Sequence, residues 1–172
     1  LINIFNSKKL NKIDVIKTNQ VESINTAVNI ANFWDKPIVG RMGYLKSFQK
    51  KKLHGVKSKF YLDSVNLEKK LAFHSSKIVL TTNQLKKSFE SSYLEFHNKI
   101  IVIPNFVDTT LFKPDYNLEK KYDLLYIGRL AEQKNIKILL EAVIGLKLKI
   151  LFIGKGPFKN NILKYKKKYN LN

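Results

Sequence analysis

The chain has 172 residues, 44% of them hydrophobic, and a formal net charge of +19 from 32 basic and 13 acidic residues. The hydrophobic content excludes a disordered tail, and the charge raises the question of a nucleic-acid or anionic-membrane partner. The absence of cysteine excludes disulfides and a cysteine nucleophile, and the three histidines are too widely spaced for a zinc site. No apolar run approaches the roughly 20 residues that a membrane span requires.

Lysine supplies most of the positive charge. Only two of the 32 basic residues are arginines, Arg41 and Arg129. Because lysine is the usual cation here and asparagine and isoleucine are also frequent, part of the charge reflects residue usage and not a binding surface. An arginine in such a chain is the more informative cation, since its planar guanidinium suits bidentate binding of an anion.

Strand and helix patterns alternate through residues 1–104. Apolar runs predict four strands, at 13–16, 38–40, 77–80 and 99–103. Helical periodicity predicts three helices, at 21–34, at 61–75 and after a cap at Thr82 or Asn83. Residues 42–59 are predicted to form a loop that contains the lysine run 50–52. Glu68 and Glu132 are expected to be solvated, because charged residues usually are.

A linker is predicted at 105–120, where Pro114 and several Asp and Asn residues occur without periodicity. Beyond it, strands are predicted at 123–127 and 148–153, and helices from Asn135 and Phe158. The run 123–127 is almost wholly apolar, which indicates a strand buried on both faces of a parallel sheet. The whole pattern predicts an α/β fold with parallel sheets. Two strands cannot bury an adequate core alone, so we expect the second domain to be cut short.

The turn from Gly128 to Lys134 is the candidate phosphate-binding site, because it joins a predicted strand to a predicted helix. A helix N-terminus offers unpaired backbone N–H groups and a partial positive charge, so it attracts phosphate. Arg129 and Lys134 would add two full positive charges there. A second turn follows at Gly154 and Gly156, whose glycines serve either the turn's own geometry or the close approach of a nucleotide.

Three segments occur in order along the chain: IVIPNFVDTTLFKPD, IGRLAEQKN and FIGKGP. Together they resemble a family 4 (group 1) glycosyltransferase of the GT-B fold, in which two Rossmann-like domains face a cleft. The resemblance assigns 1–104 to the C-terminal part of the N-terminal, acceptor-side domain and 105–120 to the interdomain linker. It assigns 121–172 to the first part of the C-terminal domain, which binds the nucleotide-sugar donor. Both domains are then incomplete.

The resemblance implies transfer of a sugar from a nucleoside-diphosphate sugar to a hydroxyl of a lipid-linked or polysaccharide acceptor, with retention. Gly128, Arg129 and Lys134 match the segment that contacts the donor diphosphate, where fixed cations stabilise the charge on the departing phosphate. This implies a site without metal and no cofactor beyond the sugar nucleotide. The family's Glu-x₇-Glu segment would lie beyond Asn172, so the catalytic residues stay unassigned and this polypeptide alone is expected to be inactive.

Two loops of the first domain are similar to cleft-facing loops of the family, KTNQ at 17–20 and the loop at 41–44. The resemblance therefore assigns Arg41 and Gly43 to the acceptor cleft; the alternative for Arg41 is a salt bridge at a strand end. Two positions depart from the family pattern. Met42 stands where a histidine before the glycine is frequent, and Lys155 stands where many relatives carry an acid.

Two other functions stay open, a basic nucleic-acid-binding module and a sugar-nucleotide epimerase of similar fold. Phe89, Tyr126 and Phe152 fall on apolar stripes, which counts against base stacking, so we expect no nucleic-acid partner. The resemblance implies a cytoplasmic enzyme of polysaccharide biosynthesis, with peripheral attachment at the inner membrane face as a further expectation. The lysine runs 50–52 and 166–168 are each expected to be solvated, and attraction to anionic phospholipid is a secondary role.

Overall fold

The computed structural model describes residues 12–171, and the chain divides into two compact units, Leu1–Asp108 (unit 1) and Thr109–Asn172 (unit 2). The division falls inside the segment 105–120 that the sequence predicts to be a linker. None of the helices in the described part is long and apolar enough to cross a membrane.

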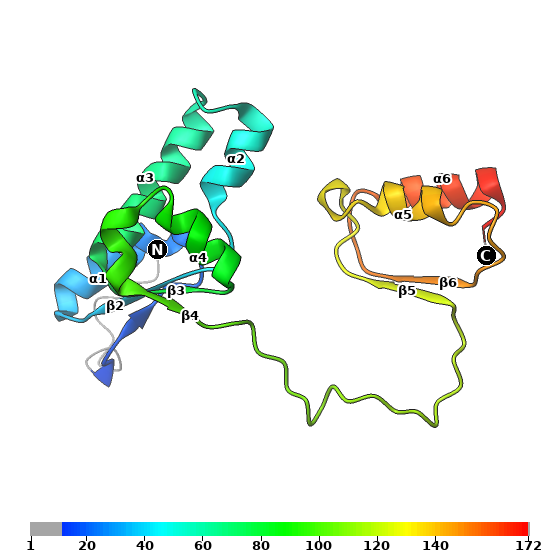
Figure 1. The fold of residues 1–172 in the computed structure, drawn as a ribbon, viewed down its shortest axis with the longest axis horizontal. Coiled ribbons are helices and arrows are strands. Elements are labelled where there is room, and N and C mark those ends of the chain that lie inside the picture. Colours follow the sequence, from blue (N-terminus) through cyan, green and yellow to red (C-terminus); the bar gives the residue numbers. More distant parts are fainter. Residues whose placement is uncertain (1–11, 172) are drawn as a thin grey trace. The chain divides into compact units, whose positions relative to one another are not determined.

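Unit 1 contains a parallel sheet with the strand order β1-β2-β3-β4 (Figure 1). The strands are β1 Ile16–Lys17, β2 Ile38–Met42, β3 Ser75–Leu80 and β4 Ile100–Val102. The helices are α1 Ile24–Trp34, α2 Lys46–His54, α3 Lys59–His74 and α4 Asn83–Glu90, with short 3-10 turns at Val21–Ser23 and Leu94–Lys99. The alternation of strand and helix agrees with the expected α/β class.

The core of unit 1 lies between its helices and one face of the sheet. Helix α1 buries Ile24, Ala27, Val28 and Ala31, which pack in one cluster with Ile38, Met42, Ile78 and Leu80. Phe89 of α4 is fully buried in the same cluster. Helix α4 begins as predicted, with the Thr82 hydroxyl accepting the Leu85 N–H at 3.0 Å.

The segment 42–59 is not a loop, which corrects the expectation from the sequence. Lys46–His54 forms α2, and α2 and α3 make a helical hairpin that projects from unit 1 (Figure 1). Ser47 is the buried residue of α2, so the helix has no apolar stripe that periodicity could detect. Its stability comes from packing on α3, as is usual for helices too short to be stable alone.

Glu68 is fully buried at 0% exposure, so the expectation that it is solvated is wrong. Its carboxylate accepts the Ser47 N–H at 2.8 Å and the Tyr93 hydroxyl at 2.8 Å. Ser47 lies in the first turn of α2, where an acidic group also complements the helix dipole. Burial, followed by the charge of Glu68, raises the pKa of Tyr93 well above its usual range, so the phenol remains a donor.

Unit 2 contains two parallel strands, β5 Leu124–Ile127 and β6 Ile150–Ile153, paired from Leu124↔Ile150 to Ile127↔Ile153. Helices α5 Ile136–Ala142 and α6 Lys159–Tyr169 lie on the same side of the strands (Figure 1). The buried residues of this core are Leu130, Ile136, Leu140, Val143 and Leu171, and Ile162, Tyr165 and Tyr169 of α6 pack against them.

The opposite face of β5 is exposed, which corrects the expectation of a strand buried on both faces. Ile127 is 69% exposed, and Leu125 and Ile153 are also exposed. Tyr126, which alternates with them, packs in the core. The two apolar runs were therefore predicted correctly as strands of a parallel sheet. In the described residues, however, helices cover only one side of that sheet.

Candidate functional site

The two glycine turns of unit 2 lie at the carboxyl ends of β5 and β6, and backbone hydrogen bonds connect them. The Gly128 N–H donates to Ile153 O at 3.0 Å, and the Leu130 N–H donates to Lys155 O at 2.9 Å. The Phe158 N–H in turn donates to Leu130 O at 2.9 Å. The first turn is therefore held in place by the second through hydrogen bonds between backbone atoms.

The close contact of these turns accounts for Gly154 and Gly156. A Cβ atom at Gly154 would collide with Gly128 O, and one at Gly156 would collide with Leu130 O. Because backbone atoms cannot shift as a flexible side chain can, both positions require glycine. Of the two explanations that the sequence left open, the turn's own geometry is sufficient, and contact with a nucleotide stays a prediction.

Arg129 and Lys134 are both exposed at the first turn. The Arg129 Nη2 donates to Gln133 Oε1 at 3.3 Å, and the Arg129 carbonyl accepts the Tyr126 hydroxyl at 3.0 Å. Among the described residues, no carboxylate lies within ion-pair distance of either cation, and no protein acceptor is bonded to the Arg129 N–H. Glu132, between them, is exposed as expected. The turn thus presents two cations that no carboxylate of residues 12–171 pairs with.

The helix does not begin directly at this turn, which corrects part of the phosphate-binding argument. A 3-10 turn, Glu132–Lys134, comes first, and Asn135 adopts a left-handed conformation with φ of 52°. Helix α5 then has only 7 residues. The helix dipole therefore contributes little near Gly128, and any attraction for an anion must come mainly from the two cations.

In unit 1, the carboxyl ends of β1 and β2 are joined by side chains. The Arg41 N–H donates to Thr18 Oγ1 at 3.0 Å, and Thr18 is buried. The Gly43 N–H donates to Gln20 Oε1 at 3.3 Å. The loop at 17–20 and the loop at 41–44 therefore lie side by side, which brings together the two segments assigned to the acceptor side.

The Arg41 guanidinium is held by neutral amides. Its Nη1 donates to Asn19 Oδ1 at 3.0 Å, and its Nη2 donates to Asn105 Oδ1 at 2.6 Å. No carboxylate among the described residues pairs with Arg41, so the alternative of a salt bridge is not what the structure has. Its positive charge is oriented but not neutralised, which leaves it able to bind an anion.

An open hollow of about 290 Å³ adjoins Gly43, on the carboxyl side of β2 and β3. Its lining includes Tyr44, Phe48, Thr81, Gln84 and Ser88. Asn105, and the hollow's polar residues Thr81 and Gln84, were not identified from the sequence. The available signal was position, because each follows the end of a parallel strand, where ligands of α/β proteins bind.

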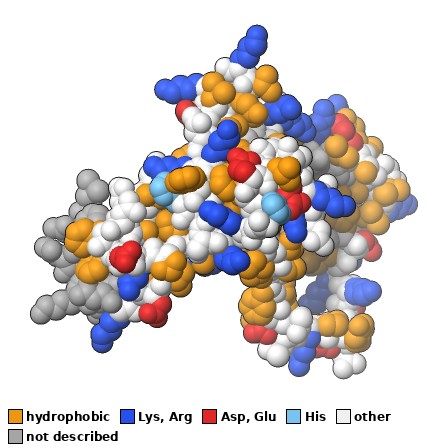
Figure 2. All heavy atoms as spheres, turned by 60° about the vertical axis from the view of Figure 1, so that its left-hand side comes forward, with side chains coloured by type: hydrophobic (Ala, Val, Ile, Leu, Met, Phe, Trp, Pro, Cys, Tyr) orange, Lys and Arg blue, Asp and Glu red, His pale blue; other side chains and the backbone are white. Residues whose placement is uncertain are grey.

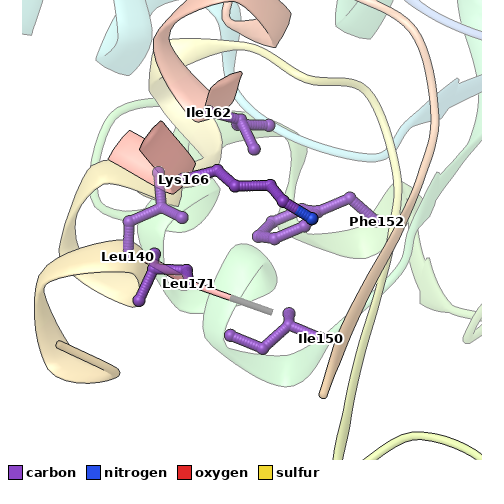
Figure 3. A pocket seen from close by; sticks show the side chains of 6 residues that line it. All are labelled: Leu140, Ile150, Phe152, Ile162, Lys166 and Leu171. Atoms are coloured by element: carbon purple, nitrogen blue, oxygen red, sulfur yellow. The ribbon is translucent and has the colours of Figure 1, made fainter. Parts of the chain in front are cut away.

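A second hollow lies inside the core of unit 2 and away from these turns (Figure 3). It has a volume of about 60 Å³ and is lined by Leu140, Ile150, Phe152, Ile162, Lys166 and Leu171. None of the predicted site residues lines it, its walls are apolar except for Lys166, and its volume is far below the roughly 300 Å³ of a small-molecule site, so we regard it as a packing gap. Within the described residues, no cluster of His, Asp or Glu could hold a metal ion.

No protein-family profile matches the chain, and a search of curated protein sequences found no match. Solved structures do match. A structure of Anabaena HepE in complex with UDP gives a TM-score of 0.69 at 13% identity, covering 95% of this chain and 47% of that chain. TarM gives 0.62 at 17% identity, covering 91% of this chain and 30% of that chain.

The apo form of the lipopolysaccharide outer core galactosyltransferase WaaB gives a TM-score of 0.57 at 16% identity, covering 95% of this chain and 43% of that chain. The chain thus spans less than half the length of each of these proteins. Since each likeness extends over both units, it shows the fold: the chain is an α/β protein with two Rossmann-like units of the GT-B type.

Proposed function

We propose that the chain is part of a glycosyltransferase that moves a sugar from a nucleoside-diphosphate donor to a hydroxyl acceptor. The observation that carries the proposal is the pair of exposed cations, Arg129 and Lys134, at the strand-end turn of unit 2. It is supported by the fold, since the matching structures include HepE in complexes with UDP and UDP-glucose and the galactosyltransferase WaaB.

The proposed role of Arg129 and Lys134 is to bind the donor diphosphate. When the sugar leaves, negative charge develops on the β-phosphate, and fixed cations stabilise that charge more in the transition state than in the ground state. Arg129 suits this role because its guanidinium is restrained only by one exposed hydrogen bond to Gln133 and can form two parallel bonds to phosphate oxygens. Two such cations would supply the electrostatic stabilisation without a metal ion.

The proposed acceptor side is the carboxyl edge of the sheet in unit 1. Arg41, Asn19, Asn105 and Gln20 supply donors and acceptors that match a glycan hydroxyl surface, and Gly43 opens onto the adjoining hollow. We propose a glycan, lipid-linked or polysaccharide, as the acceptor, and a retaining outcome as in family 4 (group 1) enzymes. The polypeptide by itself is proposed to bind its donor but not to turn it over.

Donor binding can be tested in the chain itself. UDP, UDP-glucose and GDP titrated into isotopically labelled protein should shift the amide resonances of Gly128 to Lys134, and Arg129→Ala and Lys134→Ala should each weaken binding about tenfold. Lys137→Ala is the matched control, because Lys137 is an exposed lysine of the same unit, paired with Glu141 at 3.7 Å. In the complete enzyme, each of the first two variants should lower turnover at least about tenfold.

Normal affinity in both variants would contradict the assignment of the diphosphate site. The alternatives have their own signatures. A nucleic-acid module would bind single-stranded oligonucleotide regardless of added UDP, although Phe89, Tyr126 and Phe152 pack in the two cores and offer no stacking surface. An epimerase would convert the donor in the absence of an acceptor, which product analysis detects.

A further inference from the structure

The α2–α3 hairpin ends in a tip, residues 50–62, that combines positive charge with exposed apolar side chains. The tip carries five lysines and no Asp or Glu, and the first acid after it is Asp63. Figure 2 shows lysine and hydrophobic side chains gathered on this projection at the top of the view. Such a combination on one projecting element is typical of segments that lie in the headgroup region of a membrane.

The apolar side chains of the tip have no packing role in the core. Leu53 is 63% exposed and Phe60 is 59% exposed, and Val56 and Leu62 are exposed as well. Phe60 is oriented by two groups of α2, with its ring centroid 4.8 Å from that of His54 and 5.7 Å from Lys50 Nζ. Basic and apolar groups from both helices therefore share one surface, and a binding partner could bury the apolar side chains.

The lysine run at 166–168 provides the contrast within the same chain. It lies on α6, whose apolar stripe, with Ile162 and Tyr165, already packs in the core of unit 2. Lys168 Nζ contacts the ring of its neighbour Tyr169 at 4.8 Å. This run has charge but only one exposed large apolar neighbour on its helix, Leu163. The structure thus distinguishes two runs that the sequence treats alike.

We infer that the hairpin tip docks on the surface of an anionic phospholipid bilayer, with Lys50, Lys51, Lys52, Lys57 and Lys59 at the headgroups and the exposed apolar side chains inserted between them. Charge complementarity selects this partner, because anionic lipid attracts each lysine near its surface and the headgroup layer accepts apolar side chains. Helix α2 has 9 residues and rises about 14 Å, so docking would hold the loop at Gly43 close to the membrane.

The inference does not depend on sugar transfer and can succeed or fail separately from it. Sedimentation of the protein with vesicles of equal parts phosphatidylcholine and phosphatidylglycerol should show binding that added salt weakens, and phosphatidylcholine vesicles should bind far less. Replacing Lys50, Lys51 and Lys52 together by Gln should weaken partitioning about a hundredfold. The same replacement at Lys166, Lys167 and Lys168 is the matched control and should change it less than about threefold.

The apolar contribution has its own test. Leu53→Ser, Val56→Ser and Phe60→Ser together should weaken partitioning at least about tenfold, whereas serine at the equally exposed Phe73, Leu94 and Ile138 should not. Equal losses from both lysine variants, or no loss from the tip serine variant, would overturn the inference. So would displacement of the vesicles by single-stranded oligonucleotide bound at the tip, since that result would assign the surface to nucleic acid.

Discussion

The two units organise their strand-end residues in different ways. In unit 1 side chains do it, since Thr18, Asn19 and Asn105 hold Arg41, and Glu68 holds the start of α2. In unit 2 the backbone does most of it, through hydrogen bonds between the two glycine turns, and the Tyr126 hydroxyl adds a bond to Arg129 O. A site that side chains organise depends on the chemistry of each of those residues. A site that the backbone organises depends instead on the absence of side-chain atoms where the backbone segments touch.

The same difference affects the two arginines. The Arg41 guanidinium donates hydrogen bonds to Asn19 and Asn105 in two different segments, whereas the Arg129 guanidinium, within the described part of the chain, donates one, to the exposed Gln133. A fixed guanidinium recognises a ligand that arrives in one orientation, and a less restrained one can adjust to a flexible diphosphate at a cost in ordering entropy. Three substitutions test this comparison.

The largest expected effect is that of Glu68→Ala in unit 1. The substitution leaves two buried donors, the Ser47 N–H and the Tyr93 hydroxyl, without their acceptor, and each orphaned donor costs about 2 kcal/mol. Unfolding of unit 1 should therefore become easier by about 4 kcal/mol. Chemical denaturation followed by the fluorescence of Trp34, the single tryptophan, reports on this unit alone.

The matched control for Glu68→Ala is Glu90→Ala. Glu90 pairs with Lys86 at 3.7 Å on the surface of α4, and such a pair contributes less than about 1 kcal/mol. If the two alanine variants were equally stable, the buried carboxylate would not be what holds α2 in place. That result would contradict the view that side chains organise unit 1.

Gly156→Ala should have the next largest effect, confined to unit 2. The new Cβ meets the backbone of Leu130, which can only move by separating the two turns, and overpacking of this kind costs about 3 kcal/mol. Hydrogen exchange of the Gly128 and Leu130 amides should accelerate, while Trp34 fluorescence should report an unchanged unit 1. Gly145→Ala is the control, because Gly145 has a φ of 82° but nothing within 4 Å of a Cβ, and it should cost about 1 kcal/mol.

The smallest of the three main effects is expected from Arg41→Lys, for which Arg129→Lys is the matched control. Lysine keeps the charge but cannot bond Asn19 and Asn105 at once, so the start of the linker should open more often, by about 1 kcal/mol. Hydrogen exchange of Ile103, whose N–H donates to Leu80 O at 2.8 Å, measures that opening. Arg129→Lys should change the stability of unit 2 by less than about 0.5 kcal/mol, because the Arg129 guanidinium makes an exposed, long hydrogen bond to Gln133, four residues away in the chain. Equal effects at both arginines would remove the distinction between the units.

Much of the fold could be predicted from local pattern, whereas the site could be predicted only in part. The strands at 38–40 and 77–80 were recognisable as apolar runs, but β1 proved to lie at Ile16–Lys17 and not at 13–16. The position of Arg129 and Lys134 at the turn after β5 was predicted from the sequence, and their role in binding stays a prediction. Asn105 was not, because its role depends on Arg41, 64 positions earlier in the chain.

The sequence by itself determined the alternation of strands and helices outside residues 42–59, the aperiodic segment in which the two units divide, and a helix cap at Thr82 or Asn83, because each depends on residues close together in the chain. The tertiary structure alone decided that Glu68 is buried, that Lys46–His54 is helical and that one face of β5 is exposed. Burial and close contact are properties of pairs of segments. The periodicity of one segment does not show which of its side chains another segment buries. Nor does it show which backbone atom lies close to a glycine where a Cβ atom would otherwise be.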